Sequence, residues 1–142
     1  MILLDANLLL YAYNSSSEHH VAAKGWLEGL LSHSQSVRLA WISILAFLRI
    51  STNPRAYPSP LSPAEASEIV SSWLERPMVA VLDPGERYWA ILSQLLTASQ
   101  SRGALVSDAH LAALAIEHGA TLATSDRDFT RFPDLRLLNP LG

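Results

Sequence analysis

The sequence opens with the stretch ILLDANLL at residues 2–9, an apolar run interrupted by a carboxylate and an amide. The part before Asp5 is too short for a helix and has the length of a buried strand. Residues 6–13 are apolar and compatible with a helix, and Asn14 with the serines that follow closes it as a loop. We therefore expect a strand that passes at once into a helix.

The rest of the chain repeats this alternation. Further strands are expected at residues 37–40, 78–82, 121–123 and 135–138, with helical patterns between them. Ser62-Pro63-Ala64-Glu65 has the pattern of a capping box, and Asp83 with Pro84 is expected to cap the next helix. Because several strands are wholly apolar, the pattern predicts helices on both faces of the sheet. The expected fold is α/β, a three-layer α/β/α sandwich with a central, mainly parallel sheet, forming a single domain over residues 1–142.

Length and composition narrow the functional classes. The chain has 142 residues, of which 49% are hydrophobic and 16% charged, and a net charge of −3. This composition excludes a disordered chain and argues against binding of nucleic acid through overall positive charge. The absence of cysteine excludes disulfides, thiol catalysis and cysteine-ligated zinc. No apolar run approaches the length of about 18 residues typical of a membrane span, so we expect a cytoplasmic protein with no membrane segment.

Three aspartates fall where parallel sheets bind ligands. Asp5 ends the first strand, Asp126 follows the strand at 121–123, and Asp108 opens a helix expected from residue 109. The carboxyl ends of parallel strands meet at one edge of the sheet, where helix amino termini also point. We therefore expect Asp5, Asp108 and Asp126 to converge there.

Two interpretations of these aspartates remain open. Taken singly, each fits a helix cap, since Asp is among the preferred capping residues. Taken together, ionised carboxylates within about 4 Å repel by about 4 kcal/mol per pair at an effective dielectric of about 20, and a divalent cation relieves that repulsion. Capping predicts separated carboxylates, whereas a metal site predicts a cluster. Oxygen ligands without cysteine favour Mg²⁺, with Mn²⁺ as a substitute, and such a site suits phosphodiester hydrolysis.

Three motifs resemble those of PIN-domain nucleases in their order along the chain. They are ILLDANLL at residues 2–9, VSDAHLAALA at residues 106–115, and TSDRDF at residues 124–129 followed by Phe132-Pro133. The similarity spans essentially the whole chain, at the length of the small VapC-type toxins of bacterial toxin–antitoxin pairs.

The resemblance implies a Mg²⁺-dependent endoribonuclease toxin that cuts RNA such as a tRNA or rRNA, inhibits translation and is neutralised by a cognate antitoxin. It implies Asp5 and Asp108 as catalytic metal ligands, with Asp126 as the further acid of the cluster. Asp128 would assist these ligands from outside or cap the short helix that follows Asp126.

The chain departs from the family pattern on the helix expected at residues 42–51. Members usually carry a glutamate there, whereas this chain reads Ile44-Leu45-Ala46-Phe47-Leu48-Arg49 and has no acid between Glu28 and Glu65. We therefore expect one tightly held ion. The departure also keeps a second interpretation open, a catalytically impaired PIN-like module that binds RNA or protein.

A phosphotransferase of the haloacid-dehalogenase or receiver type also places an aspartate at the end of its first strand. The former needs a second aspartate two residues later, where this chain has Asn7. The latter needs a lysine at a strand end, which Lys24, the only lysine, does not supply. Both classes are disfavoured.

Three polar residues are candidates for supporting roles. Asn7 is expected to hydrogen-bond a water on the ion or the scissile phosphate, or to cap the turn after the first strand. Ser107 and Ser125 each precede an aspartate and are expected to cap a helix or to hold the orientation of a carboxylate.

Surface properties suggest partners. Arg38, Arg49 and Arg55 lie in a span without acids and are expected to form a basic rim for RNA phosphates or to be ordinary solvated side chains. The high apolar content favours a homodimer and a groove for an antitoxin.

Overall fold

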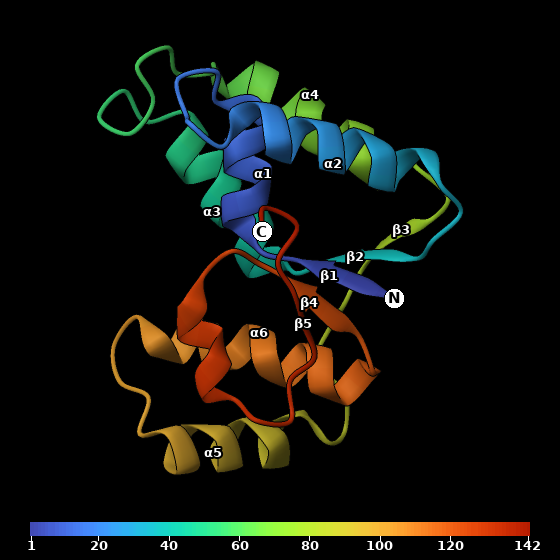
Figure 1. Cartoon of the computed structure of the whole chain (residues 1–142), viewed down its shortest axis with the longest axis vertical. Coiled ribbons are helices and arrows are strands. Elements are labelled where there is room, and N and C mark those ends of the chain that lie inside the picture. The colour runs from blue at the N-terminus through green and yellow to red at the C-terminus, as the bar shows by residue number, and fades with distance from the viewer.

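The computed structural model describes residues 1–142, with five short strands between two groups of helices (Figure 1). The strands are β1 (Ile2–Leu4), β2 (Val37–Leu39), β3 (Val79–Val81), β4 (Thr121–Ala123) and β5 (Leu137–Leu138). The helices are α1 (Ala6–Tyr13), α2 (His20–Ser32), α3 (Trp41–Ser51), α4 (Pro63–Leu74), α5 (Tyr88–Ser99) and α6 (Leu105–His118), with a 3₁₀ helix, η1, at Arg127–Arg131. None of the helices combines the length and the apolar character needed to cross a membrane.

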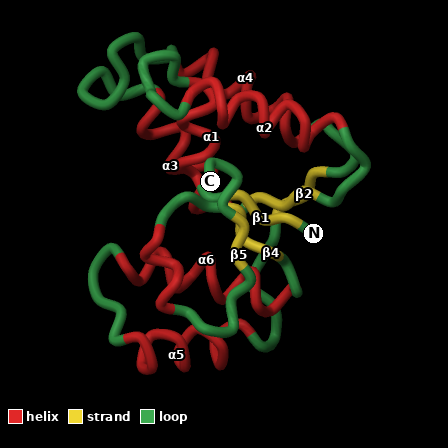
Figure 2. The backbone as a smooth tube through the Cα atoms, in the orientation of Figure 1, coloured by secondary structure: helices red, strands yellow, loops and turns green.

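The sheet is entirely parallel, with the strand order β3-β2-β1-β4-β5. β1 lies in the middle, where Ile2 is opposite Val37 of β2 on one side and Thr121 of β4 on the other. Helices α1 to α4 cover one face and α5 and α6 cover the other, and Figure 2 shows the strands gathered between these two helical layers. The predicted three-layer α/β/α fold is confirmed.

β1 contributes side chains to both hydrophobic cores, because successive residues of a strand point to opposite faces. Ile2 and Leu4 pack with α1 to α4, whereas Leu3 packs with α5 and α6. All three are at most 7% exposed. A strand buried on both faces has no position for a polar residue, which explains the unbroken apolar run before Asp5.

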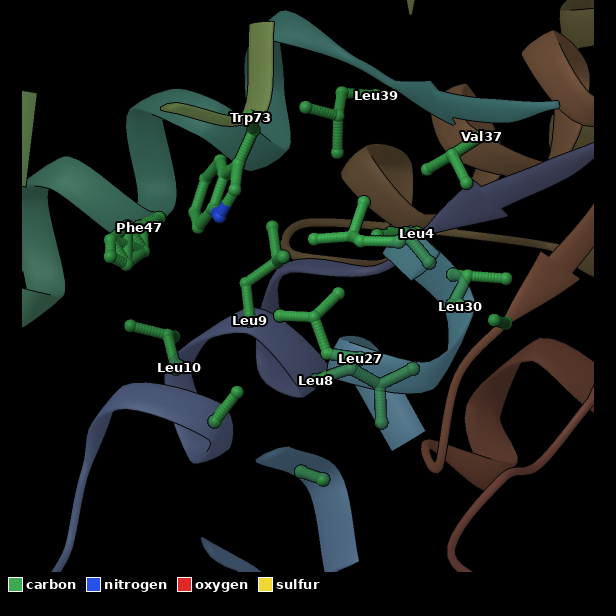
Figure 3. Close-up of a cluster of buried hydrophobic side chains, with 14 of the residues drawn as sticks. Leu4, Leu8, Leu9, Leu10, Leu27, Leu30, Val37, Leu39, Phe47 and Trp73 are labelled. Atoms are coloured by element: carbon green, nitrogen blue, oxygen red, sulfur yellow. The ribbon is translucent and has the colours of Figure 1, made fainter. Parts of the chain in front are cut away.

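The larger core packs leucines of α1 and α2 against Phe47 of α3 and Trp73 of α4 (Figure 3). The centroid of the Phe47 ring lies 4.8 Å from that of Trp73 and 5.6 Å from that of Tyr13, in edge-on geometry. Nε1 of Trp73 donates to the Tyr13 hydroxyl at 3.1 Å, so the polar atom of this buried indole has a partner.

The capping box predicted at the start of α4 is confirmed. The Ser62 hydroxyl accepts the amide of Glu65 at 3.1 Å, and the Glu65 carboxylate accepts the amide of Ser62 at 3.0 Å. These reciprocal bonds satisfy two donors that a helix start would otherwise leave without a partner.

The cap predicted at residues 83–84 is wrong, because α5 begins only at Tyr88. Glu117, near the end of α6, holds the intervening loop: its carboxylate accepts the amides of Gly85 at 2.7 Å and Arg87 at 2.9 Å. A Cβ on Gly85 would lie 2.7 Å from that carboxylate, so a larger residue here would displace the end of the Glu117 side chain. A contact between distant segments thus replaces the local cap.

We expect Phe47→Ala to lower the free energy of unfolding by about 3–5 kcal/mol, because it removes a ring from a core that can close only partly over the cavity. Phe47 is fully buried, whereas Leu45 on the same helix is 60% exposed. Leu45→Ala is therefore the matched control and should change the free energy of unfolding by less than about 0.5 kcal/mol. Urea unfolding measures both, and equal effects would contradict the packing described.

Candidate metal centre

Two neighbouring strands deliver acidic side chains to the carboxyl edge of the sheet. Asp5 directly follows β1, and residues 124–126 directly follow β4, which pairs with β1. The amide of Asp5 donates to the carbonyl of Ala123 at 3.0 Å, so strand pairing continues to the point where the chains leave the sheet. The parallel register therefore places Asp5 close to the segment that carries Asp126.

Thr124 links these two aspartates. Its hydroxyl donates to Oδ2 of Asp5 at 2.7 Å and accepts the backbone amide of Asp126 at 3.0 Å. Thr124 is 3% exposed and Asp5 is 8% exposed, so both need partners inside the protein. Thr124 was not among the residues predicted for the site. Its signal was a hydroxyl residue at the end of a strand, two positions before a candidate acid.

Asp126 is the N-cap of η1, because its Oδ1 accepts the amide of Asp128 at 2.9 Å. Together with the bond from its own amide to Thr124, this contact fixes the orientation of the Asp126 carboxylate. The side-chain cap of η1 is therefore Asp126, whereas Asp128 lies in the first turn of this helix. Both roles predicted for Asp128 stay predictions.

Asp108 lies on a helix and not at the end of a strand. α6 begins at Leu105, four residues earlier than expected, so Asp108 lies in its first turn. The preceding helix ends at Ser99, and a short turn with left-handed Gln100 and Gly103 joins the two helices without a strand. A first-turn position favours a carboxylate because the helix amino terminus carries partial positive charge.

Asp108, Asp126 and Asp128 form the acidic group of this edge, and one carboxylate oxygen of each lies within 4.8 Å of the corresponding oxygens of the other two. Asp5 is not one of the three. It is buried beside them, and its charge acts on Asp108. Asp126 both caps η1 and belongs to the acidic group, so the two predicted interpretations of the aspartates do not exclude each other at this residue.

Burial and mutual repulsion raise the pKa values at this edge. Burial raises the pKa of Asp108, and the charges of the neighbouring aspartates add to the effect, bringing it to about 6. Burial also raises the pKa of Asp5, with a contribution from the charge of Asp126, while the hydrogen bond from Thr124 lowers it. Ionisation of these carboxylates is thus unfavourable in the protein alone, and a bound cation would stabilise the ionised form.

The donor set fits a divalent metal ion. All candidate ligand atoms are carboxylate oxygens, and the burial of the three acids grades from half-buried Asp108 and Asp126 to exposed Asp128. Mg²⁺ and Mn²⁺ prefer such hard oxygen ligands, and Mg²⁺ usually keeps several waters beside one or two carboxylates. The acidic group could therefore hold an ion and still leave positions open to water or substrate.

Arg131 is a basic side chain beside the acidic group that our sequence analysis also missed. Its Nε donates to the backbone carbonyl of Asp128 at 2.9 Å, and its Nη2 lies 3.9 Å from the Asp128 carboxylate. The Arg131 guanidinium lowers the pKa of Asp108, against the combined effect of burial and the other acids. The sequence did contain a signal for this contact, because Asp128 and Arg131 are three residues apart, a spacing that brings two side chains together on one helical turn.

The predicted supporting residues have fewer contacts than expected. Neither Ser107 nor Ser125 makes a side-chain hydrogen bond. The N-cap position of α6 is Ala104, without a side-chain cap, and Asp126 caps η1, so capping by these serines is wrong. Asn7 is half-buried in the first turn of α1. Its contact with a substrate phosphate stays a prediction.

The arginines expected to form a basic rim are spread over the fold. Nη1 of Arg38 donates to the carbonyls of Val37 at 2.9 Å and Met78 at 3.1 Å, at the amino edge of the sheet. The acidic group lies at the opposite edge. Arg49 is in the last turn of α3 and Arg55 in the loop that follows, and both are exposed. RNA binding by these arginines stays a prediction.

Comparisons with known proteins agree with this geometry. The family model of the PIN domain matches residues 2–135. Ribonuclease VapC37 of Mycobacterium tuberculosis is 43% identical over 140 residues, which cover 99% of this chain and 97% of the relative. Ribonuclease VapC33 of the same organism is 37% identical over 141 residues, which cover 99% of each chain.

Solved structures share the fold. VapBC2 from Rickettsia felis, bound to a DNA fragment from its promoter, aligns with a TM-score of 0.72 at 22% identity and 98% coverage of both chains. FitAcB from Neisseria gonorrhoeae aligns with a TM-score of 0.66 at 22% identity, covering 99% of this chain and 98% of that one.

A parallel sheet with an acidic group at its carboxyl edge, matched by the family model over nearly all its length, defines a PIN domain. The chain belongs to the PIN-domain family and, within it, to the VapC ribonucleases. The family predicted from three short motifs is confirmed.

The helix that usually carries the family's additional glutamate is α3, and here it supplies no acid to the site. Ala46 stands in the corresponding segment and is half-buried. The carboxylates therefore come only from the end of β1, the first turn of α6 and the segment from β4 into η1.

We expect the stability of the protein in EDTA to fall as the pH rises from about 4 through about 6. The folded protein keeps the Asp108 proton up to about pH 6, whereas the unfolded chain releases it near pH 3.8. Between these values the folded state binds more protons, so raising the pH destabilises it. Asp108→Asn should flatten this dependence and raise the melting temperature near neutral pH.

Glu68→Gln is the matched control, because Glu68 is exposed on α4. Thermal unfolding of the three proteins across this pH range tests the expectation. The same pH dependence in wild type and Asp108→Asn would show that Asp108 carries no raised pKa.

We expect Thr124→Val to weaken divalent-ion binding by about 10–100-fold, because it removes the link between Asp5 and the Asp126 amide. Thr124→Ser keeps the hydroxyl and should bind the ion nearly as wild type does. Isothermal titration with Mg²⁺ and Mn²⁺ provides the comparison. Tight binding by the valine variant would mean that the acidic group does not depend on this hydroxyl.

Proposed function

We propose that this protein is a metal-dependent endoribonuclease that hydrolyses phosphodiester bonds of RNA, with Mg²⁺ as its ion and Mn²⁺ as a substitute. The observation that carries the proposal is the acidic group at the carboxyl edge of the sheet, beside the buried carboxylate of Asp5. Relatives named ribonucleases that align over nearly the whole chain support the same activity.

The acidic group would hold the ion through its carboxylate oxygens, and Asp5 would add negative charge from the buried side. A divalent cation held by these residues would supply an activated water and charge stabilisation for phosphodiester hydrolysis. Thr124 and the cap of η1 orient Asp126 through hydrogen bonds within the protein. The ligands are therefore positioned before any substrate arrives, which reduces the reorganisation needed for reaction.

One tightly held ion fits this set of residues. One carboxylate oxygen of each acid in the acidic group lies within 4.8 Å of the others, a spacing that suits a single ion. Residues 44–49 of α3, where the family usually has a glutamate, include no acid. A second ion, if the reaction uses one, would come with the phosphate of the RNA.

The same absence of a glutamate favours a second candidate function, a catalytically impaired PIN-like module that binds RNA or protein. The two functions predict the same fold and the same ion. They differ in whether RNA is cut.

We also propose that the protein is the toxin of a toxin–antitoxin pair, acting in the cytoplasm on an RNA of translation such as a tRNA or rRNA. Neutralisation by a cognate antitoxin is supported by the solved neighbours, which include the VapBC assembly of Rickettsia felis and a toxin–antitoxin complex from Klebsiella pneumoniae. Residues 1–142 act as a single domain in this proposal, since β1 is shared by both cores.

Exposed apolar side chains support a homodimer. Trp41 and Leu45 lie one turn apart on α3 and are 51% and 60% exposed, and Trp89 on α5 is 67% exposed. Large apolar side chains exposed on a monomer favour a surface that another protein covers. Trp73, in contrast, is a core residue.

Purified protein should cut RNA in the presence of Mg²⁺ or Mn²⁺ and stop when EDTA is added. Asp126→Asn should lower the rate by about a hundredfold, because it removes one ligand charge and disturbs the cap of η1. Glu68→Gln should cut at the wild-type rate. End-labelled total tRNA and rRNA resolved on denaturing gels provide the readout. A wild type that binds Mg²⁺ and RNA but cuts nothing would favour the binding module.

A further inference from the structure

A recess lies directly beside the acidic group, between the segment from β4 into η1 and the end of β5. Its volume is about 260 Å³. The lining is polar except for Leu137 and includes Asp126, Ser125, Arg127, Thr130 and Asn139. Because Asp126 belongs to both features, a molecule in this recess would be adjacent to the metal centre.

The recess offers hydrogen-bond donors that no other part of the protein uses. The backbone carbonyl of Arg127 accepts a hydrogen bond from the Thr130 hydroxyl. The guanidinium of Arg127 is exposed and takes part in no hydrogen bond or ion pair. The hydroxyl of Ser125 is likewise without a partner. Oδ1 of Asn139 accepts the amide of Leu141 at 3.0 Å, which leaves the amide nitrogen of its side chain as a donor.

These donors suit an anion, and the neighbouring acids restrict which anion can bind. An isolated anion beside Asp126 would be repelled by the acidic group. A nucleic-acid strand avoids this problem, because one of its phosphates can meet the ion while the next meets the guanidinium. Arginine is well matched to this role, since its planar fork of donors fits phosphate oxygens.

We propose that this recess is a subsite for the RNA backbone phosphate adjacent to the one that is cleaved, with Arg127 as its cation. The inference rests on the proposed function, because it takes RNA as the substrate. Leu137, 37% exposed on the edge strand β5, adds an apolar surface for the attached sugar or base.

The subsite gives Arg127 a different role from that of two other arginines of the chain. Arg131 is bonded to Asp128 and partly balances the acidic group. Arg38 is bonded to backbone carbonyls at the amino edge. Arg127 directly follows a member of the acidic group and keeps its guanidinium available.

The experiment compares Arg127→Gln with Arg136→Gln. Both variants remove one positive charge, but Arg136 precedes β5 at the amino edge, where its Nη2 donates to the carbonyl of Gly119 at 2.6 Å. The probe is a short fluorescein-labelled single-stranded RNA in Mg²⁺, followed by anisotropy over a range of salt concentrations. Arg127→Gln should weaken binding by about fourfold at physiological salt and lower the slope of log affinity against log salt by about 0.7. Arg136→Gln should change neither, and Arg127→Lys should keep most of the slope.

A second measurement locates the contact. Once the wild-type cleavage site in an RNA is mapped, single uncharged methylphosphonate linkages are placed on each side of it. One of them should slow cleavage by wild type and have no further effect on Arg127→Gln, because the partner charge is already missing. Slowing by the same factor in both proteins would show that Arg127 does not contact that phosphate.

The outcomes separate this inference from the proposed function. The rise in melting temperature caused by Mg²⁺ should be equal in all variants, and its loss in Arg127→Gln would overturn the subsite by assigning Arg127 to the metal centre. If wild type binds and cuts RNA while Arg127→Gln behaves as Arg136→Gln does, the subsite is wrong and the proposed function stands. If wild type neither binds nor cuts RNA, both are wrong.

Discussion

Thr124 donates its hydroxyl proton to Asp5 and accepts the amide of Asp126, and the carboxyl edge of the sheet is organised around this chain of hydrogen bonds. It joins residues that are far apart in sequence and lie at the ends of adjacent strands. A buried carboxylate without such a partner would strongly oppose folding. The hydroxyl therefore makes the burial of Asp5 tolerable and, through the backbone of Asp126, connects it to the acidic group.

Rigidity at this edge comes from β1. The strand is paired on both sides and packs into both cores, so the position of Asp5 is restrained by the sheet and by two helical layers. Sites built on such elements hold their geometry better than sites built on loops alone. The other acids are added to this base by short elements, the first turn of α6 and the cap of η1. Loop variation elsewhere can change the surface without moving the centre.

The charges around the edge have opposing effects. Burial and the charges of the neighbouring aspartates raise the pKa of Asp108, and the Arg131 guanidinium lowers it, so the negative charge of this edge is only partly compensated. In a chain with a net charge of −3, attraction of RNA requires local positive charge and a cation. The proposed arrangement places the cation at the acidic group and the guanidinium of Arg127 beside it, so that consecutive phosphates would meet positive charge in turn.

Residues 2–17 by themselves determined that a buried strand passes into a helix ending in a loop, because length and periodicity are local properties of a sequence. The TSDRDF motif likewise indicated a short helix after Asp126, and the capping box at Ser62 was visible from residue spacing alone. Only the tertiary structure decided which acids meet. Asp128 joins the acidic group while Asp5 lies buried beside it, and the partners of each depend on strand order, helix start and the crossing of distant segments. No local pattern encodes those distances, since they are set by how the two helical layers pack on the sheet.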